Sequence, residues 1–354
     1  MIPTPPDEVV HYLQAFRTRY STAEVLAYLE VLKTLKVMVV GEIILDEYVY
    51  CEALGKSGKE AMLVMKYISQ ERYAGGVLAI ANHLAEFCQQ ITLVSYLGDL
   101  NSHEAFVRQQ LRPNITSVFV YKTNSPTIIK RRFLDSYTRS KLLGVYEIND
   151  EWLDEQEEGE LCRLLEQRLP DVDLAIVADY DHGLITPKIV DVLTRHAPFL
   201  AINTQVNAAN IGFHSISKYQ RADFICTNEN ELRMDRRSRK GELEELVRHL
   251  SRKMHCQSML ITRGTNGTLL YRENEGFTTC PAFAVKVVDR IGAGDAVLAL
   301  ASLLSVRGIP SDVISFVGNV VGAEAVAIIG NKQALDKPLL TQSIARFLKK
   351  EYNM

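Results

Sequence analysis

Short apolar runs recur along the chain, and longer amphipathic stretches separate them. The first run, Lys-Val-Met-Val-Val-Gly-Glu-Ile at 36–43, is typical of a strand buried on both faces of a sheet. Similar runs follow at 91–97, 174–179, 199–203, 224–226 and 258–262. Helical stretches alternate with them at 76–88, 102–111, 151–168, 187–196 and 241–255, and the chain is nearly all helical from Ala293 onward. This alternation predicts an α/β fold with a central, mostly parallel sheet flanked by helices.

Two regions break the alternation with short patterns rich in β-branched and aromatic residues. They are 48–54 with 62–73, and 117–122 with 127–135 and 141–148. These patterns predict a small antiparallel sheet, over about 48–73 and 117–148, inserted between the early strands as a lid. Unpaired strand edges and an apolar face need cover, so we also expect a homodimer formed through this lid.

The first thirty-five residues have a different character. Ser21 and Glu24 match a capping box, which predicts an amphipathic helix to about Leu35, and an earlier helix is expected after Pro5-Pro6. We therefore expect an N-terminal helical arm over 1–35 and one α/β domain over 36–354. Two roles stay open for the arm: contact with a partner, and packing on the domain.

Composition narrows the possible partners. The formal net charge is −3, which offers no overall field for nucleic acid or an anionic membrane. The six cysteines are widely spaced without a C-x-x-C pair, which favours a reduced, cytoplasmic protein without a zinc or disulfide framework. The N-terminus has no signal-peptide pattern, and the apolar run 296–306 is too short to span a membrane.

Candidate chemistry centres on Gly292-Ala293-Gly294-Asp295, which follows a strand-like stretch at 284–288 and opens the apolar helix 296–306. Glycines at a helix start leave backbone N–H groups free to hold an anion, and the helix dipole adds positive potential there. A carboxylate beside a phosphate held in this way can accept a hydroxyl proton during phosphoryl transfer. Taken alone, the pattern is equally that of a glycine turn with an Asp that stabilises a helix start.

Other segments make the interpretation more specific. The segment 287–295 resembles the C-terminal signature of the ribokinase-like (PfkB) carbohydrate kinases. Further landmarks resemble that family in the same order: 41–46 with Gly75-Gly76, 179–183, 227–231 and 262–267. The resemblance covers roughly residues 36 to 350. It implies a ribokinase-like fold and an ATP- and Mg²⁺-dependent kinase.

Within the family, the chain is most similar to the heptose-phosphate-type sugar kinases of bacterial surface-polysaccharide synthesis. The segments 39–50, 125–133 and 179–183 carry this likeness. It implies phosphorylation of a sugar or sugar phosphate that feeds nucleotide-sugar synthesis. Such kinases are often fused to a nucleotidyltransferase. None of the eight His forms an H-x-G-H element, so we expect that activity on a separate chain in the same pathway.

The resemblance implies a role for each matching residue. Asp295 would be the catalytic base, beside the amides of Gly292, Ala293 and Gly294. The acceptor sugar would be held by Asp46, Gly75 and Gly76. Lys130 and Arg132 would face it from the lid, where they could neutralise a phosphate on the substrate.

The nucleotide side is assigned in the same way. The resemblance implies nucleotide-binding residues at Asn228, Arg263, Gly264, Gly267, Asn319 and Ala323. Asn228 and Glu231 would organise Mg²⁺ through water. Simpler structural interpretations stay open: Asp46 could cap a turn, Asn228 and Glu231 could begin a helix, and the two glycines after Arg263 could form an ordinary hairpin.

Several positions depart from the family pattern. Glu42 stands where Asp is usual, which lengthens a side chain in a sugar-contact region. Ala79 replaces a common Asn, and Ile291 replaces the Thr that precedes the glycine turn. The segment 203–205 reads Asn-Thr-Gln where related heptose kinases carry an Asp-Pro-Lys-like segment. These departures cluster on the substrate side.

Two alternatives to a sugar kinase stay open. The departures at Ala79 and Ile291, with the N-terminal arm, are compatible with a weakened relative that binds nucleotide or sugar as a scaffold. A nucleoside kinase is the other alternative, although Lys130 and Arg132 favour an anionic acceptor.

Overall fold

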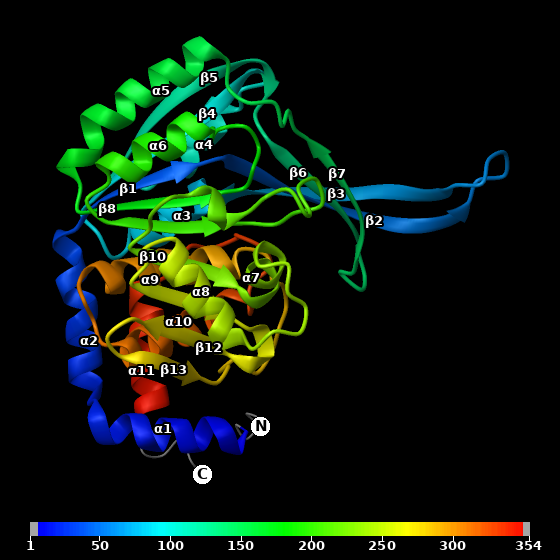
Figure 1. The fold of residues 1–354 in the computed structure, drawn as a ribbon. Coiled ribbons are helices and arrows are strands. Elements are labelled where there is room, and N and C mark those ends of the chain that lie inside the picture. Colours follow the sequence, from blue (N-terminus) through cyan, green and yellow to red (C-terminus); the bar gives the residue numbers. More distant parts are fainter. Residues whose placement is uncertain (1–5, 350–354) are drawn as a thin grey trace.

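The computed structural model describes residues 6–349, so the outermost residues of the predicted arm and domain, 1–5 and 350–354, lie outside it. A nine-stranded sheet runs through the molecule (Figure 1). Its strands are β1 (Lys36–Gly41), β4 (Gln90–Leu100), β5 (Ile115–Pro126), β8 (Leu174–Asp179), β9 (Leu200–Thr204), β10 (Phe224–Asn228), β11 (Ser258–Thr262), β12 (Thr268–Arg272) and β13 (Gly276–Cys280). Their order is β13-β12-β11-β10-β9-β8-β1-β4-β5, and only the β11–β12 and β12–β13 pairs are antiparallel. The predicted mostly parallel α/β sheet is confirmed.

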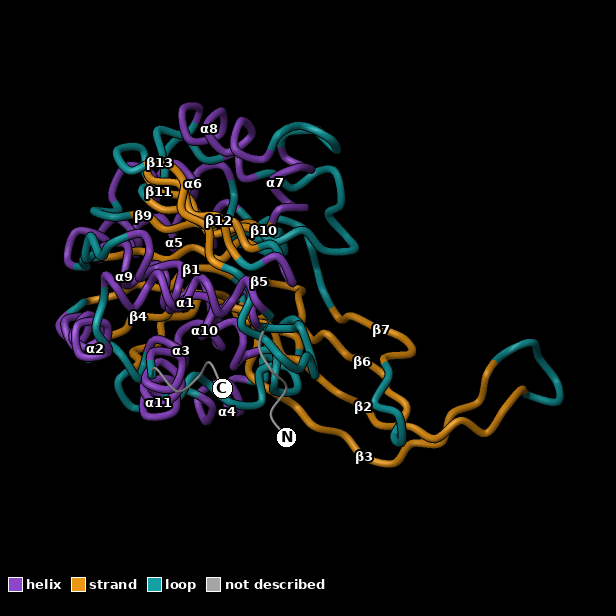
Figure 2. The backbone as a smooth tube through the Cα atoms, turned by 90° about the horizontal axis from the view of Figure 1, so that it is seen from below, coloured by secondary structure: helices purple, strands orange, loops and turns teal. Residues whose placement is uncertain are grey.

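Helices lie on both faces of this sheet. They are α3 (Val77–Leu84), α4 (Glu104–Gln110), α5 (Glu155–Arg168), α6 (Pro187–His196), α7 (Glu229–Asp235), α8 (Leu243–Lys253), α9 (Ala293–Val306), α10 (Ser311–Ala325) and α11 (Lys337–Leu348). Figure 2 shows α8 on one side of the strands β11, β12 and β13 and α10 on the other. Within residues 6–349, no helix is long and apolar enough to cross a membrane.

Local sequence explains where these elements begin and what they bury. The Thr186 side chain caps α6 by accepting the N–H of Ile189 at 3.3 Å, and Pro187 occupies the first turn, where its missing N–H costs nothing. Strand β1 lies between β8 and β4, and its residues from Val37 to Val40 are fully buried. Such central strands read as continuous apolar runs because both faces of the sheet are covered.

The lid is a separate four-stranded sheet of β2 (Ile43–Lys56), β3 (Leu63–Gly76), β6 (Ile129–Asp135) and β7 (Lys141–Glu147), in the order β3-β2-β6-β7. Its outer pairs are antiparallel, and the central β2–β6 pair is parallel. Figure 1 shows β2 and β3 projecting away from the body.

The strand predicted for the lid at 117–122 belongs instead to the large sheet. It is part of β5, which pairs with β4 in parallel over most of its length. Alternating, aromatic-rich residues suit either sheet, because β5 is itself an edge strand with one partner.

The helices predicted in the N-terminal arm pack on the body. They are α1 (Asp7–Arg19) and α2 (Thr22–Glu30), and the predicted capping box of Ser21 and Glu24 is present. Val9, Leu13 and Phe16 of α1 are buried, and the Phe16 ring lies 4.5 Å from that of Phe316 in α10. Packing on the domain is therefore the role that the structure shows for α1.

The strand-like stretch at 284–288 was a wrong prediction. It forms an exposed loop after β13 and adds no strand beyond β13 at that edge of the sheet. The amides of Val288 and Asp289 instead donate to the carbonyl of Val326, just after α10, at 2.7 and 3.2 Å. The loop that leads to the glycine turn is thus attached to a helix end.

Candidate active site

The parallel strands β1, β8, β9, β10 and β11 all end at one edge of the large sheet, where α/β folds commonly bind ligands. The segments that follow β8, β10 and β11 contain the landmarks at 179–183, 227–231 and 262–267. Helix α9 contacts both β8 and β10 and begins with the glycine turn. The fold therefore brings segments that are distant in sequence to one site.

The glycine turn has the geometry of an anion-binding helix start. Gly292 precedes α9 with φ +80°, a left-handed conformation that favours glycine, and a Cβ there would lie 1.9 Å from Asn331 Oδ1. The first N–H groups of a helix have no intrahelical partner. Asp295 lies in this first turn, where its side chain is buried while Gly294 stays exposed.

Asp295 accepts a hydrogen bond from the hydroxyl of Tyr180, with 3.0 Å between Oη and Oδ1. Burial raises the pKa of Asp295 to about 7, and the Tyr180 hydroxyl offsets part of that rise. Among nearby charges, Asp46 and Glu231 raise this pKa further, while Lys130 lowers it. A carboxylate poised near neutral pH suits a general base.

The predicted acceptor residues lie on the lid beside Asp295. Asp46 in β2 is the register partner of Lys130 in β6. Its two oxygens accept hydrogen bonds from Arg132 and, at 3.2 Å, from Asn331. A Cβ at Gly75 would lie 2.4 Å from Asp46 Oδ2, so only glycine fits against this carboxylate.

The Lys130 side chain is buried between aromatic rings. Its ammonium lies 5.7 Å from the ring of Tyr146 and 5.9 Å from that of Tyr180. Burial lowers the pKa of Lys130, and Asp46 offsets part of this effect. Arg132 is already paired with Asp46, so Lys130 is the less committed of the two predicted cations.

The Glu42 carboxylate, expected in a sugar-contact region, is occupied by backbone donors. It is fully buried and accepts backbone N–H groups from Tyr180 and His182 at 3.1 Å and from Leu184 at 3.3 Å. The extra methylene relative to Asp extends this carboxylate toward the segment after β8. Glu42 thus supports the segment that carries Tyr180.

Asn228 and Glu231 form the capping box of α7. The Asn228 side chain accepts the Glu231 N–H at 2.9 Å, and Glu231 accepts the Asn228 N–H and the Thr227 hydroxyl at 3.0 Å. Burial raises the pKa of Glu231, and these donors offset part of the rise. The helix-start interpretation is therefore correct for this pair. The other Glu231 oxygen, Oε1, accepts the Val206 N–H at 3.2 Å and keeps a lone pair for water.

The remaining predicted nucleotide residues lie around β11, β12 and α10. Arg263 donates to Glu229 at 3.1 Å, and its backbone N–H closes the turn that contains Gly264 and Gly267. Asn319 is buried, and its amide nitrogen donates to Thr268 and to the carbonyl of Ser315, both at 2.8 Å. Ala323 is half-buried one turn later in α10.

Asp289 connects the lid to the glycine turn. Its carboxylate accepts Tyr48 of β2 at 3.1 Å, Lys141 of β7 at 2.6 Å and the Gly330 N–H at 3.2 Å. It also accepts the N–H of Ile291, the residue before Gly292. Burial raises the pKa of Asp289, but these donors hold it below its ordinary value.

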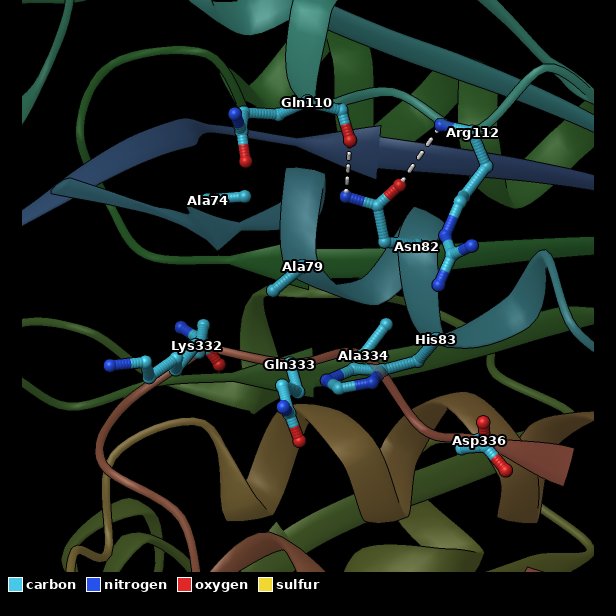
Figure 3. Close-up of a pocket in the computed structure, with 11 residues that line it drawn as sticks. Ala74, Ala79, Asn82, His83, Gln110, Arg112, Lys332, Gln333, Ala334 and Asp336 are labelled. Carbon is cyan, nitrogen blue, oxygen red and sulfur yellow. Dashed lines mark hydrogen bonds between the residues drawn. The ribbon is translucent and has the colours of Figure 1, made fainter. Parts of the chain in front are cut away.

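A polar groove of about 410 Å³ lies beside this site, between α3, the end of α4 and the segment 331–336 (Figure 3). Asn82 in its wall bonds to the carbonyl of Gln110 and the N–H of Arg112. Ala79 also lines the groove. Asp295 does not line the groove, and Asn331, which does, also binds Asp46.

Sequence reasoning missed Tyr180, Asp289 and Asn331. Tyr180 and Asp289 lie inside recognised landmarks, but their partners are far away in sequence. Asn331 follows α10 and carries no motif signal. Its side chain nevertheless donates to Asp46 and fills the position that a Cβ at Gly292 would need.

Comparisons with known proteins show the family of the chain. A family profile described as "pfkB family carbohydrate kinase" matches residues 34–336. Among curated relatives, the bifunctional protein HldE of Campylobacter jejuni strain RM1221 is 25% identical over 300 residues, covering 84% of this chain and 61% of that protein. HldE of Koribacter versatilis is 27% identical over 302 residues, covering 83% and 60%. The chain thus spans about three fifths of the length of these relatives.

Solved structures share the fold. Phosphofructokinase-2 from Escherichia coli in complex with potassium has a TM-score of 0.69 at 14% identity, covering 89% of this chain and 99% of that one. Arabidopsis thaliana ribokinase complexed with ribose and ATP has a TM-score of 0.63 at 19% identity, with the same coverage. The predicted ribokinase-like fold is confirmed.

Replacing Asp295 with Asn should stabilise the protein, and more so at higher pH. The folded-state pKa of Asp295 lies above its unfolded value, so its contribution to stability is present in acid and is lost as pH rises through about 7. We expect the free energy of unfolding of Asp295→Asn to exceed that of the wild type by on the order of 2 kcal/mol at pH 8, and by less at pH 5. Urea unfolding at pH 8 and at pH 5 measures the free energy of unfolding of each protein. Asp171→Asn, at an exposed carboxylate, is the control and should show no such pH dependence. Equal effects at the two pH values would contradict the buried, raised carboxylate.

Proposed function

The chain belongs to the pfkB family of carbohydrate kinases, and we propose that it transfers the γ-phosphoryl group of ATP to a hydroxyl of a heptose-phosphate-like sugar. The observation that carries this proposal is the buried Asp295 carboxylate in the first turn of α9, next to the glycine turn and to Asp46. The likeness of 39–50 and 125–133 to heptose-phosphate-type kinases supports the choice of acceptor.

In this reaction, Asp295 accepts the proton of the acceptor hydroxyl. The hydroxyl oxygen forms a bond to the γ-phosphorus, the bond from that phosphorus to the β–γ bridging oxygen breaks, and ADP leaves. The amides of Gly292, Ala293 and Gly294 hold the transferring group. Asp46, with the backbone at Gly75 and Gly76, orients the acceptor, which supplies much of the rate advantage of such a site.

Charge favours an anionic acceptor. Lys130 is buried beside Asp46 and Tyr180 and is the cation that a substrate phosphate can reach without breaking an existing ion pair. Arg132 can contribute only by sharing its bond to Asp46. We therefore assign Lys130 the larger part in binding a phosphorylated sugar.

We assign the nucleotide to the edge formed by β10, β11 and α10. Its phosphates would lie along the turn at 263–267, and its base would lie near Asn319 and Ala323. Across residues 6–349, no cluster of three or more His, Cys, Asp or Glu could hold a metal. Mg²⁺ commonly keeps several waters and binds through substrate phosphates and one or two carboxylates. Glu231 and Asn228 fit that arrangement, and Mg²⁺ would there neutralise charge on the phosphates.

The product would carry a second phosphoryl group and would suit a nucleotidyltransferase, which joins a sugar phosphate to a nucleotide.

The lid also favours a homodimer. β7 is an edge strand, and exposed apolar side chains gather on the lid: Leu54, Met62, Leu63, Tyr67, Ile68, Leu142 and Leu143. Covering such a patch with a second copy removes apolar surface from water.

The kinase proposal is tested by ADP release with a panel of free and phosphorylated hexoses and heptoses. We expect turnover with at least one phosphorylated heptose, and a loss of on the order of 100-fold or more in Asp295→Asn. Lys130→Met should raise the KM for the phosphorylated acceptor by roughly tenfold or more while leaving the KM for ATP unchanged. Lys66→Met, at an exposed lid lysine, is the matched control.

Turnover with nucleosides alone would contradict the sugar assignment. ATP binding without turnover on any acceptor would favour the scaffold alternative, to which the departures at Ala79 and Ile291 point.

The dimer proposal predicts that Leu143→Asp shifts the protein from dimer to monomer, because it places a charge on the apolar lid surface. Light scattering after size-exclusion chromatography measures the mass, and Lys59→Ala in the exposed lid hairpin should leave the mass unchanged. A wild-type monomer at all accessible concentrations would contradict the proposal.

A further inference from the structure

We propose that Tyr180 is a positioning residue for Asp295, and that Glu42 in turn fixes the backbone that carries Tyr180. The inference rests on the proposed function, because it requires Asp295 to act as the base. Glu42, Tyr180 and Asp295 come from three separate parts of the chain and are linked by two hydrogen bonds.

The bond between Tyr180 and Asp295 is enclosed. The Tyr180 ring is almost completely buried, and its hydroxyl reaches Asp295 Oδ1 at 3.0 Å. In the part of the chain that the structure describes, the Asp295 side chain accepts no other hydrogen bond from a protein side chain. One carboxylate oxygen is thus held, and the other is left to face the acceptor hydroxyl. A held carboxylate keeps a single orientation for proton transfer.

Tyr180 is itself fixed from both sides of its peptide. Its N–H donates to Glu42 Oε2 at 3.1 Å, and its carbonyl accepts the side-chain amides of Asn207 and Asn210 at 2.9 and 3.3 Å. The other Glu42 oxygen accepts the N–H groups of the next two alternate residues, His182 and Leu184. One buried carboxylate therefore fixes three amides of this turn.

The length of the Glu42 side chain explains why Glu stands at this position, where Asp is usual in the family. An Asp at this position would be one methylene shorter and would not reach all three amides with the same backbone. The longer Glu42 side chain therefore acts on the catalytic base indirectly: it holds the backbone of Tyr180, and Tyr180 holds Asp295.

Both carboxylates lie among several charged and titratable groups. Asp295 is faced by Tyr180 after β8, Asp46 on β2, Lys130 on β6, Cys226 on β10 and Glu231 on α7. Glu42 is faced by Asp179, Lys218, Lys122 and Lys130. Burial raises the pKa of Asp295, and the Tyr180 hydroxyl opposes that rise because it donates to the ionised form. Removing the hydroxyl should therefore leave less ionised base at neutral pH.

The test is the pH dependence of kcat for Tyr180→Phe, which deletes one hydroxyl and keeps the ring. We expect the acid limb of the profile to move upward by about one pH unit, so that turnover falls roughly tenfold at pH 6 and recovers toward the wild-type value at pH 9. The KM for ATP should stay unchanged. A purely structural role for Tyr180 would lower the rate by the same factor at every pH.

Tyr12→Phe is the control, because Tyr12 is a partly buried tyrosine of α1 whose ring packs on Phe16 and Phe283 and touches neither Asp295 nor the turn after β8. Its acid limb should match that of the wild type. Glu42→Asp is the second variant, read in the same assay if Tyr180→Phe does not fold, and its acid limb should move in the same direction by a smaller amount.

The outcomes distinguish a failure of the positioning role of Tyr180 from a failure of the proposed kinase function. A wild-type acid limb in both Tyr180→Phe and Glu42→Asp overturns this inference. If Asp295→Asn is inactive in the same assay, the proposed function survives that result. Full turnover by Asp295→Asn would instead remove the base, and both proposals with it.

Discussion

The burial of one carboxylate governs the site. Asp295 lies in the first turn of a helix whose following residues are almost all buried, so its charge has little water around it. A buried carboxylate needs hydrogen-bond donors or protonates instead. Here one donor is a tyrosine hydroxyl from the neighbouring strand end, and positive potential comes from the helix start and from Lys130. The balance leaves the pKa near neutrality, where a carboxylate can both lose and accept a proton.

The surrounding structure holds that balance in place. Glu42 accepts the N–H of Tyr180 and so fixes that segment. Asp289 joins the loop before Gly292 to the lid by accepting hydrogen bonds from Tyr48 and Lys141. Asn331 joins the segment after α10 to Asp46. Each of these links is a hydrogen bond between elements that are far apart in the chain. The lid, the glycine turn and the turn after β8 are therefore joined by direct hydrogen bonds around Asp295.

Sequence patterns predicted the order and type of most elements, because buried parallel strands and capped helices leave local signals. The capping box of Ser21 and Glu24 is one such signal. The landmarks also located Asp295, Asp46 and Lys130 near one another. Two strand assignments were wrong: 117–122 joined the large sheet, and 284–288 formed a loop, since alternating apolar residues do not reveal which partner strand exists. Tyr180 and Asn331 could not be assigned, because their partners lie 115 and 285 residues away.

The central claim is that the glycine turn receives the transferring phosphoryl group beside Asp295. A crystal structure with a non-hydrolysable ATP analogue tests this most directly. The account predicts that the γ-phosphate lies against the backbone N–H groups at the start of α9, with Asp295 still bonded to Tyr180 and its second oxygen open toward Asp46. A nucleotide bound away from this turn, or an Asp295 side chain rotated away from Tyr180, would contradict it.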